Sequence, residues 1–290
     1  MKVVLSSSLL DPAEEYDHLV ECGKLDECEI TLPSIHLSVS QLGTYARCPR
    51  QYEFRYIKGV ISPPQARMAE GTAVHRALEV GHRERQDTGS TAPLSVLLDA
   101  HNDAWKNARA DITKWDDDYD SEDTVVKRGQ TFLTKYHKHF LPRLKPVGVE
   151  KRFWVSLGAS NIPVLGYIDL LTEYADADTG EVNGEIEVVD YKVIARTKSR
   201  AEVDGDLQLT LYSGAAHTQR VRFDMFVKTK DPSITTLRSL RTPKDWKWAE
   251  QVFTGVAEAI AKGAFPPCLP TNWTCTKDWC GYWHLCRGGL

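Results

Sequence analysis

Residues 164–194, VLGYIDLLTEYADADTGEVNGEIEVVDYKVI, decide the fold of this chain. Both ends of the stretch are rich in β-branched and aromatic residues, which favour strands, and Asp176–Gly184 between them has the composition of a hairpin turn. Asp169 lies in the first strand among apolar residues, and Asp190 lies in the second strand. An isolated acid in such a strand is costly unless it is paired or bound to a metal. The two acids therefore predict a metal site, with an ordinary surface acid as the alternative.

Lys192 follows Asp190 at a spacing of two. Strand residues two apart point to the same face, so the carboxylate and the ammonium lie side by side. The carboxylate can hold a divalent metal, while the lysine can orient a water or stabilise charge on a scissile phosphate. Taken alone, this pattern is more typical of a solvated strand pair.

The surrounding sequence predicts an α/β fold, with a mixed central sheet flanked by helices. Further strands are expected at 147–157, 221–228 and 234–240, and helices at 206–217, at 243–262, from Ser38 or Ser40 with a kink or restart at Pro49, and from Gly71. We expect a single domain over 34–290, with a helical insertion at 91–143, a cysteine segment at 264–290 and an N-terminal extension at 1–33.

Composition limits the function classes. A chain of 290 residues with 42% hydrophobic and 9% aromatic content can bury a full core. The net charge of −4 argues against a protein that coats nucleic acid by bulk charge, although a local basic cleft is compatible with it. No apolar run approaches the roughly 18 residues of a membrane helix, and the first residues do not resemble a secretory signal. We expect a cytoplasmic protein of a prokaryotic or phage-infected cell, with no membrane partner.

Four further residues are candidates for chemistry. His75 lies early in a predicted helix, where a lone histidine is more often structural than a ligand. Gln208 and Tyr212 are four residues apart on another predicted helix and share a face, which equally suits an ordinary helix surface. Glu150, on the strand before Asp169, is an additional acidic candidate.

Taken in order, Gly71–His75, Gly166–Asp169, Asp190–Lys192 and Gln208-x₃-Tyr212 resemble the RecB-type branch of the PD-(D/E)XK nuclease superfamily over about residues 36–288. The resemblance implies a restriction-endonuclease-like core in which His75, Asp169 and Asp190 bind Mg²⁺ or Mn²⁺ and Lys192 assists the attacking water. It also assigns Gln208 and Tyr212 to the active site and the DNA face. A nitrogen ligand improves Mn²⁺ binding, so we expect activity with both metals, often better with Mn²⁺.

The cysteines predict a second metal group. Of seven, four fall in the last 23 residues, and in a reducing cytosol such clusters favour a metal site over disulfides. Cys275-x₄-Cys280-x₅-Cys286 supplies three thiolates, and Cys48 is the natural fourth donor. The setting of Cys48 resembles the iron–sulfur nucleases of the superfamily, including the CRISPR-associated exonucleases and the AddB nuclease domain. This resemblance implies that the four cysteines hold a [4Fe–4S] cluster.

Alternatives for this group stay open. The family interval between the first two C-terminal cysteines is two residues rather than four, so Cys268 is an alternative to Cys275. Zinc is the rival occupant, because four thiolates also suit a tetrahedral structural site. Cys22 and Cys28 are spare thiols with no assigned role.

The motifs together predict an exonuclease acting on linear DNA with a preference for single strands. Arg47, Arg50 and the basic stretch 196–200 are candidates for phosphate contacts, with a solvated loop as the alternative for the stretch. A non-catalytic DNA-binding or scaffold module of the same fold and a zinc-stabilised adaptor are the competing hypotheses. The sequence contains no phosphate-binding loop, so any helicase or recombination partner must be a separate protein. Repair, recombination, spacer acquisition and phage DNA processing remain open as pathways.

Overall fold

The computed structural model describes residues 36–62, 64–112, 115, 119–157, 163–175 and 182–286. They form two compact units. The cysteine unit contains the described parts of Met1–Ser62, Trp154–Leu165 and Glu250–Leu290. The sheet unit contains those of Pro63–Phe153 and Gly166–Ala249. The expected extension over 1–33, with Cys22 and Cys28, lies outside the described residues.

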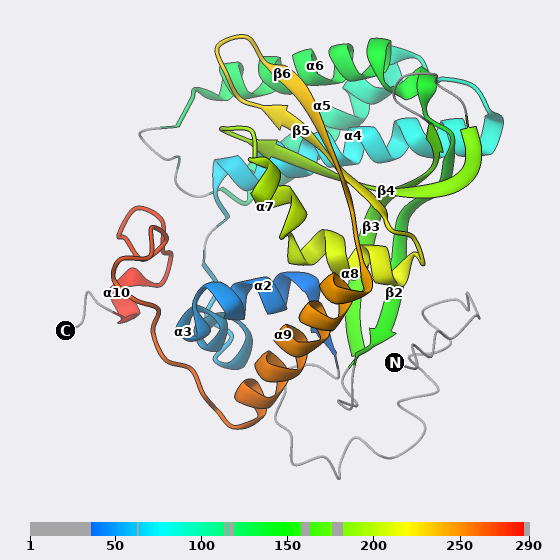
Figure 1. Ribbon diagram of the computed structural model, residues 1–290. Coiled ribbons are helices and arrows are strands. Elements are labelled where there is room, and N and C mark those ends of the chain that lie inside the picture. The colour runs from blue at the N-terminus through cyan, green and yellow to red at the C-terminus, as the bar shows by residue number, and fades with distance from the viewer. Residues whose placement is uncertain are drawn as a thin grey trace, which may run out of the picture. The chain divides into compact units, whose positions relative to one another are not determined.

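The sheet unit is built on a mixed sheet, as the sequence predicted (Figure 1). Its strands are β2 (Pro146–Ser156), β3 (Pro163–Ala175), β4 (Val182–Ile194), β5 (Arg220–Val227) and β6 (Ser233–Leu240). β4 pairs antiparallel with β3 and parallel with β5, whereas β5 and β6 are antiparallel and β2 pairs with β3. Helices α7 (Arg200–Asp204) and α8 (Leu207–Ala215) connect β4 to β5. β4 starts at Val182, so the last three residues of the stretch predicted as a turn, 182–184, belong to the strand.

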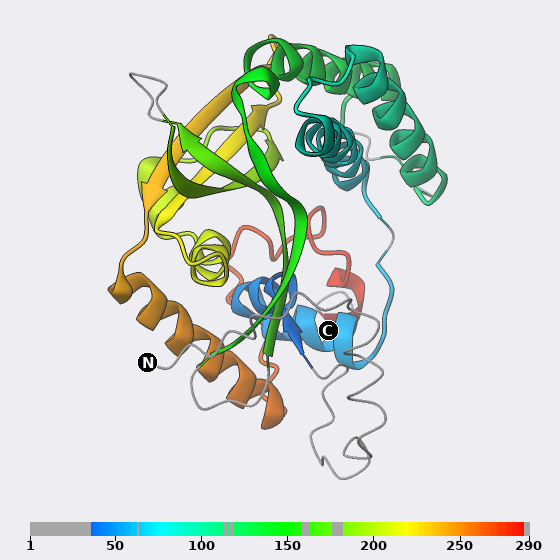
Figure 2. The same ribbon diagram turned by 90° about the vertical axis from the view of Figure 1, so that its right-hand side faces the viewer.

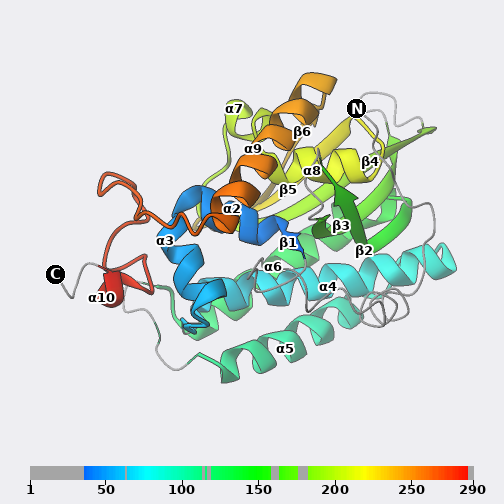
Figure 3. The same ribbon diagram turned by 90° about the horizontal axis from the view of Figure 1, so that it is seen from below.

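A helical layer packs on one face of this sheet (Figures 2 and 3). It consists of α4 (Ala66–Thr88), α5 (Leu94–Ala110) and α6 (Glu122–His139), followed by the short 3₁₀ helix η2 (Leu141–Arg143). Their apolar faces meet Val189 and Tyr191 of β4 and Phe226 of β5 in one buried core. The described residues of 91–143 are therefore mainly helical, as the sequence pattern indicated. No helix in the described part of the chain is long and apolar enough to cross a membrane.

The predicted start of the α4 helix at Gly71 is wrong. The helix begins five residues earlier at Ala66, after Gln65 in extended conformation. Ala66 and Ala69 are 0% and 4% exposed in a core with Trp105 of α5, so tertiary packing stabilises the additional turn. Glycine inside a helix costs only about 1 kcal/mol relative to alanine, which this burial offsets.

The cysteine unit begins with β1 (Leu37–Ser38), which runs parallel to the start of β3. It continues with helices α2 (Val39–Arg47) and α3 (Pro49–Tyr52) and the π-helical turn η1 (Glu53–Ile57). Its C-terminal part contains the end of α9 (Pro243–Ala261) from Glu250 onward and α10 (Trp283–Cys286). Ser38 and Gln41 form a capping box, which decides between the two predicted N-caps. Pro49 starts a new helix after Cys48, as expected. The Tyr45 hydroxyl donates to the Ala264 carbonyl and ties α2 to the segment after α9.

Candidate active site

The two acids of the fold-deciding stretch lie on neighbouring strands of the sheet unit. β3 and β4 pair with Leu170 opposite Val189, and the Tyr191 N–H donates to Asp169 Oδ2 at 2.8 Å. Because Val189 and Tyr191 project into the core under α4 and α6, Asp190 and Lys192 project to the opposite face. Helix α8 packs there against β4 and β5.

His75 and Glu150 lie next to Asp169. The Nδ1 atom of His75, on α4, lies 3.6 Å from Asp169 Oδ2. Within the described residues, His75, Glu150 and Asp169 are the group of metal-ligating side chains whose ligand atoms all lie within 4.8 Å of one another. Burial lowers the pKa of His75, but the Asp169 carboxylate outweighs it and raises this pKa above its usual value. Burial raises the pKa of Asp169, but His75, Lys192 and the Tyr191 N–H together lower it.

Glu150 has a backbone conformation that its sequence did not indicate. Its φ is 47°, in the left-handed region, although it lies inside strand β2. Such a residue costs roughly 1–3 kcal/mol and persists only where its surroundings enforce it, often at functional sites. Burial, with the nearby charges of Asp169 and Glu79, raises the pKa of Glu150 to about 7.

Asp190 and Lys192 form a buried ion pair. The Lys192 Nζ atom lies 2.6 Å from Asp190 Oδ2, and the Asp190 side chain is 1% exposed. Neither carboxylate oxygen of Asp190 accepts a hydrogen bond of good geometry, so the ammonium contact is electrostatic. Burial raises the pKa of Asp190 to about 7 against the opposing effect of Lys192. Burial lowers the pKa of Lys192, but Asp190 and Asp169 outweigh it and raise this pKa.

Gln208 and Tyr212 continue this chain of contacts from α8. Asp206 caps the helix through its side chain, and the four-residue spacing places both residues on one face. The Lys192 ammonium donates to Gln208 Oε1 at 3.0 Å, and Gln208 Nε2 donates to the Tyr212 hydroxyl at 2.7 Å. Burial raises the pKa of Tyr212, so its hydroxyl stays protonated. The structure thus connects Asp190, through Lys192 and Gln208, to Tyr212.

Gly166 has a steric role in the same site. A Cβ atom at this position would lie 2.4 Å from the ring of Phe153, which real Cβ contacts do not reach. The Phe153 ring packs edge-on against Tyr212, with centroids 5.5 Å apart. The absence of a side chain at Gly166 thus leaves the room that the Phe153 ring occupies, which gives a steric reason for the first residue of the Gly166–Asp169 motif.

The donor set fits a divalent cation. Three ligand atoms converge at His75, Glu150 and Asp169, and Asp190 lies buried beside Lys192, whose ammonium is 2.6 Å from its Oδ2 atom. A buried carboxylate is costly unless a cation compensates it. One imidazole among carboxylates suits Mn²⁺ as well as Mg²⁺.

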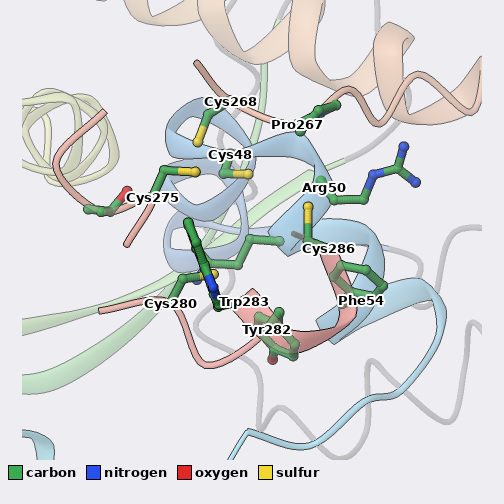
Figure 4. A pocket seen from close by; sticks show the side chains of 12 residues that line it. Cys48, Arg50, Phe54, Pro267, Cys268, Cys275, Cys280, Tyr282, Trp283 and Cys286 are labelled. Atoms are coloured by element: carbon green, nitrogen blue, oxygen red, sulfur yellow. The ribbon is translucent and has the colours of Figure 1, made fainter. Parts of the chain in front are cut away.

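In the cysteine unit, five cysteines line one pocket: Cys48, Cys268, Cys275, Cys280 and Cys286. All five are free thiols, and Figure 4 shows their sulfur atoms around a common space with Phe54, Tyr282 and Trp283. Burial raises the pKa of Cys268 to about 12, and the neighbouring Cys48 and Cys275 thiols add to this effect. Burial likewise raises the pKa of Cys280. Cys268 thus lies in the group beside Cys275 rather than apart from it.

The cations of the basic stretch have acidic partners. Arg196 pairs with Glu202 at 2.8 Å, and Lys198 pairs with Asp206 at 3.3 Å. Arg200 pairs with Asp204 at 3.3 Å. The stretch is therefore closer to charge balance than its sequence indicated.

The sequence matches the family model of the PD-(D/E)XK nuclease superfamily over residues 36–287. The chain belongs to this superfamily, whose members are nucleases that use divalent metals and whose substrate is DNA.

Among solved structures, a candidate exonuclease from Eubacterium rectale is 12% identical, with 90% of each chain covered and a TM-score of 0.53. At this identity the likeness shows the shared fold alone. The crystal structure of SSO0001 is 13% identical over 76% of this chain and 85% of that chain, with a TM-score of 0.37, and carries no argument. Comparison with curated proteins gives no match.

Proposed function

We propose that this protein is a metal-dependent exodeoxyribonuclease of the RecB-like iron–sulfur branch, acting on linear DNA with a preference for single strands. The observation that carries the proposal is the continuous set of contacts in the sheet unit, where His75 meets Asp169 and Asp190 meets Lys192. An intact acid, lysine and imidazole set counts against the non-catalytic module of the same fold.

We assign His75, Asp169 and Asp190 to the binding of Mg²⁺ or Mn²⁺. Glu150, whose ligand atom groups with those of His75 and Asp169, would contribute a further carboxylate. The bound cation supplies Lewis-acid stabilisation of the phosphate and a lowered pKa of an attacking water. Asp169 is held for this role by the Tyr191 N–H, which fixes its carboxylate against the β4 backbone.

Lys192 acts as a cation rather than as a base. Its raised pKa keeps the ammonium protonated near neutral pH, so it can donate hydrogen bonds but cannot accept a proton. Gln208 holds it at 3.0 Å, and Tyr212 in turn orients Gln208. We assign to Lys192 the orientation of the attacking water and the stabilisation of charge on the scissile phosphate.

Cys48, Cys275, Cys280 and Cys286 would hold a [4Fe–4S] cluster, which joins the N-terminal and C-terminal parts of the cysteine unit. One zinc ion bound by four thiolates is the rival occupant of this pocket.

The cluster proposal is tested on anaerobically purified protein by visible absorbance, iron and sulfide content, and thermal unfolding. Cys280→Ala should lose colour and stability. Comparison of Cys268→Ala with Cys275→Ala identifies the fourth ligand, because only the ligand variant should lose iron. Zinc in place of iron in the wild type, or unchanged colour and stability in Cys280→Ala, would overturn the cluster assignment.

Residues 34–290 would form one nuclease domain of a cytoplasmic protein that works on DNA ends, with any helicase or recombination partner as a separate chain. Repair, recombination and phage DNA processing all supply such ends. End-dependent cleavage is the property that separates this function from an endonuclease.

The activity is tested with end-labelled linear and circular single-stranded DNA, in Mn²⁺, Mg²⁺ or EDTA. Wild-type protein should degrade the linear substrate alone, and only with metal. Asp190→Asn should abolish cleavage. Asp224→Asn is the matched control, because Asp224 is equally buried on the neighbouring strand but pairs with Arg222 and accepts from Thr236. Asp224→Asn protein that is folded should still cleave the linear substrate. Absence of cleavage by well-folded wild-type protein would refute the enzyme and favour the binding module.

A further inference from the structure

The cysteine unit exposes two tryptophans that touch each other. Trp273 and Trp279 are 67% and 48% exposed, and their rings pack edge-to-face with centroids 5.1 Å apart. Tryptophan carries one of the largest apolar surfaces of any side chain and is highly buried on average. A pair that remains exposed on the same segment indicates a surface for binding.

The backbone around Trp273 is held by its own hydrogen bonds. The Asn272 Oδ1 atom accepts from the Thr274 N–H at 3.0 Å and from its hydroxyl at 2.8 Å. The Asn272 Nδ2 atom donates to the Arg47 carbonyl at 3.3 Å, which places the end of α2 beside the tryptophan segment. The site is therefore pre-organised, which reduces the entropy lost on binding.

The neighbouring segment 47–58 is strongly cationic. It contains Arg47, Arg50, Arg55 and Lys58 against a single acid, Glu53, in a chain whose net charge is −4. Arg50 and Lys58 share this acid at 2.6 and 3.0 Å. The segment packs on the cysteine segment, because the Arg50 N–H donates to the Pro266 carbonyl at 3.1 Å and Phe54 stacks on Tyr282. A local excess of positive charge thus adjoins an exposed aromatic pair.

We propose that Trp273 and Trp279 form a stacking platform for the bases of single-stranded DNA, with Arg47 placed to meet the adjoining phosphates. The substrate class rests on the proposed nuclease function. Unpaired bases offer their faces to aromatic rings, whereas paired bases in a duplex are stacked on one another. The local cationic charge favours a nucleic acid over an apolar protein as the occupant. The platform thereby favours single-stranded over double-stranded DNA.

The experiment measures binding apart from cleavage. Fluorescence anisotropy of a labelled oligothymidylate in EDTA gives Kd without hydrolysis. Trp273→Ala and Trp279→Ala should each raise Kd about tenfold, within the range for loss of one stacked base, and the two Phe variants should stay within about threefold. Leu269→Ala, on the same segment with 74% exposure, and Trp248→Ala, on α9 with 43% exposure, are the matched controls and should bind as the wild type does.

A second probe separates stacking from structural damage. An abasic oligonucleotide of equal length keeps the phosphates but lacks bases, so wild-type protein should bind it more weakly and the Trp→Ala variants should bind it no worse than the wild type. Unchanged Kd for oligothymidylate in both Trp→Ala variants, an equal loss on both probes, or an equal loss in Leu269→Ala would overturn the platform. Cleavage is assayed separately, so an inactive wild type that shows the tryptophan-dependent binding would refute the nuclease and not the platform.

Discussion

Gly166→Ala tests whether the first residue of the Gly166–Asp169 motif is set by close packing. The new Cβ would lie 2.4 Å from the Phe153 ring and 3.2 Å from Tyr212 Cε1. Carbon atoms pack at about 3.5–4.0 Å, so the Phe153 ring must move by about 1 Å. Overpacking of this kind typically costs about 1–3 kcal/mol of folding stability.

The same movement should reach the active site. Phe153 packs on Tyr212, whose hydroxyl accepts from Gln208, which in turn holds the Lys192 ammonium. A misplacement of about 1 Å can cost on the order of 100-fold in rate. We therefore expect both a loss of stability and a loss of cleavage in the folded protein.

The assay combines urea unfolding with the rate of linear DNA cleavage under conditions where the variant is folded. Gly43→Ala is the matched control, because nothing lies within 4 Å of a Cβ at this helical position, and it should gain about 0.5–1 kcal/mol. Adding Phe153→Leu to Gly166→Ala should recover part of the stability. Wild-type stability and rate in Gly166→Ala would refute the packing argument.

Three other predictions concern buried or ligand-binding groups. Burial, and to a smaller extent the charges of Arg222 and Arg85, lower the pKa of His82 to about 3 in the folded protein. The usual value in an unfolded chain is about 6.5, so only the unfolded state binds this proton as the pH falls below 6.5. Between pH 7 and pH 5, the free energy of unfolding measured in urea should therefore fall by about 2 kcal/mol more in the wild type than in His82→Gln. Parallel pH profiles of the two proteins would contradict this prediction. Mn²⁺ at about 100 times its Kd should stabilise the folded protein by about 2.7 kcal/mol. In thermal shift, His75→Ala should weaken the binding of Mn²⁺ more than the binding of Mg²⁺, and the reverse order would exclude His75 as a ligand. Glu70 is fully buried and lies 2.6 Å from Arg128. Glu70→Leu alone should lower the free energy of unfolding by about 3–5 kcal/mol, and adding Arg128→Met should recover most of this loss. If the losses of the two single variants add in the double variant, Glu70 and Arg128 are not a coupled pair.

Much of the fold followed from local sequence patterns. The strand composition of 164–174 and 186–194, the helix start at Ser38 or Ser40 and the kink or restart at Pro49 each depend on residues within a few positions of one another, so they could be predicted without tertiary contacts. The spacing of Asp190 and Lys192 likewise predicted one shared face. These features are local, and the structure agrees with them.

Packing between distant segments decided the rest. The left-handed Glu150 beside His75 and Asp169, and the contact of Phe153 with Gly166, join residues that are far apart in the chain. The early start of α4 depends on burial against α5.

Cys268 shows the same limit in the cysteine unit. The interval of four residues between Cys275 and Cys280 made Cys268 an alternative ligand, and the folded chain places Cys268 against Cys48 and Cys275 in one pocket. The sequence by itself determined which residue types carry the chemistry and on which elements they lie. Only the tertiary structure decided which of them meet, because the burial and the contacts that bring them together arise from segments separated by many residues.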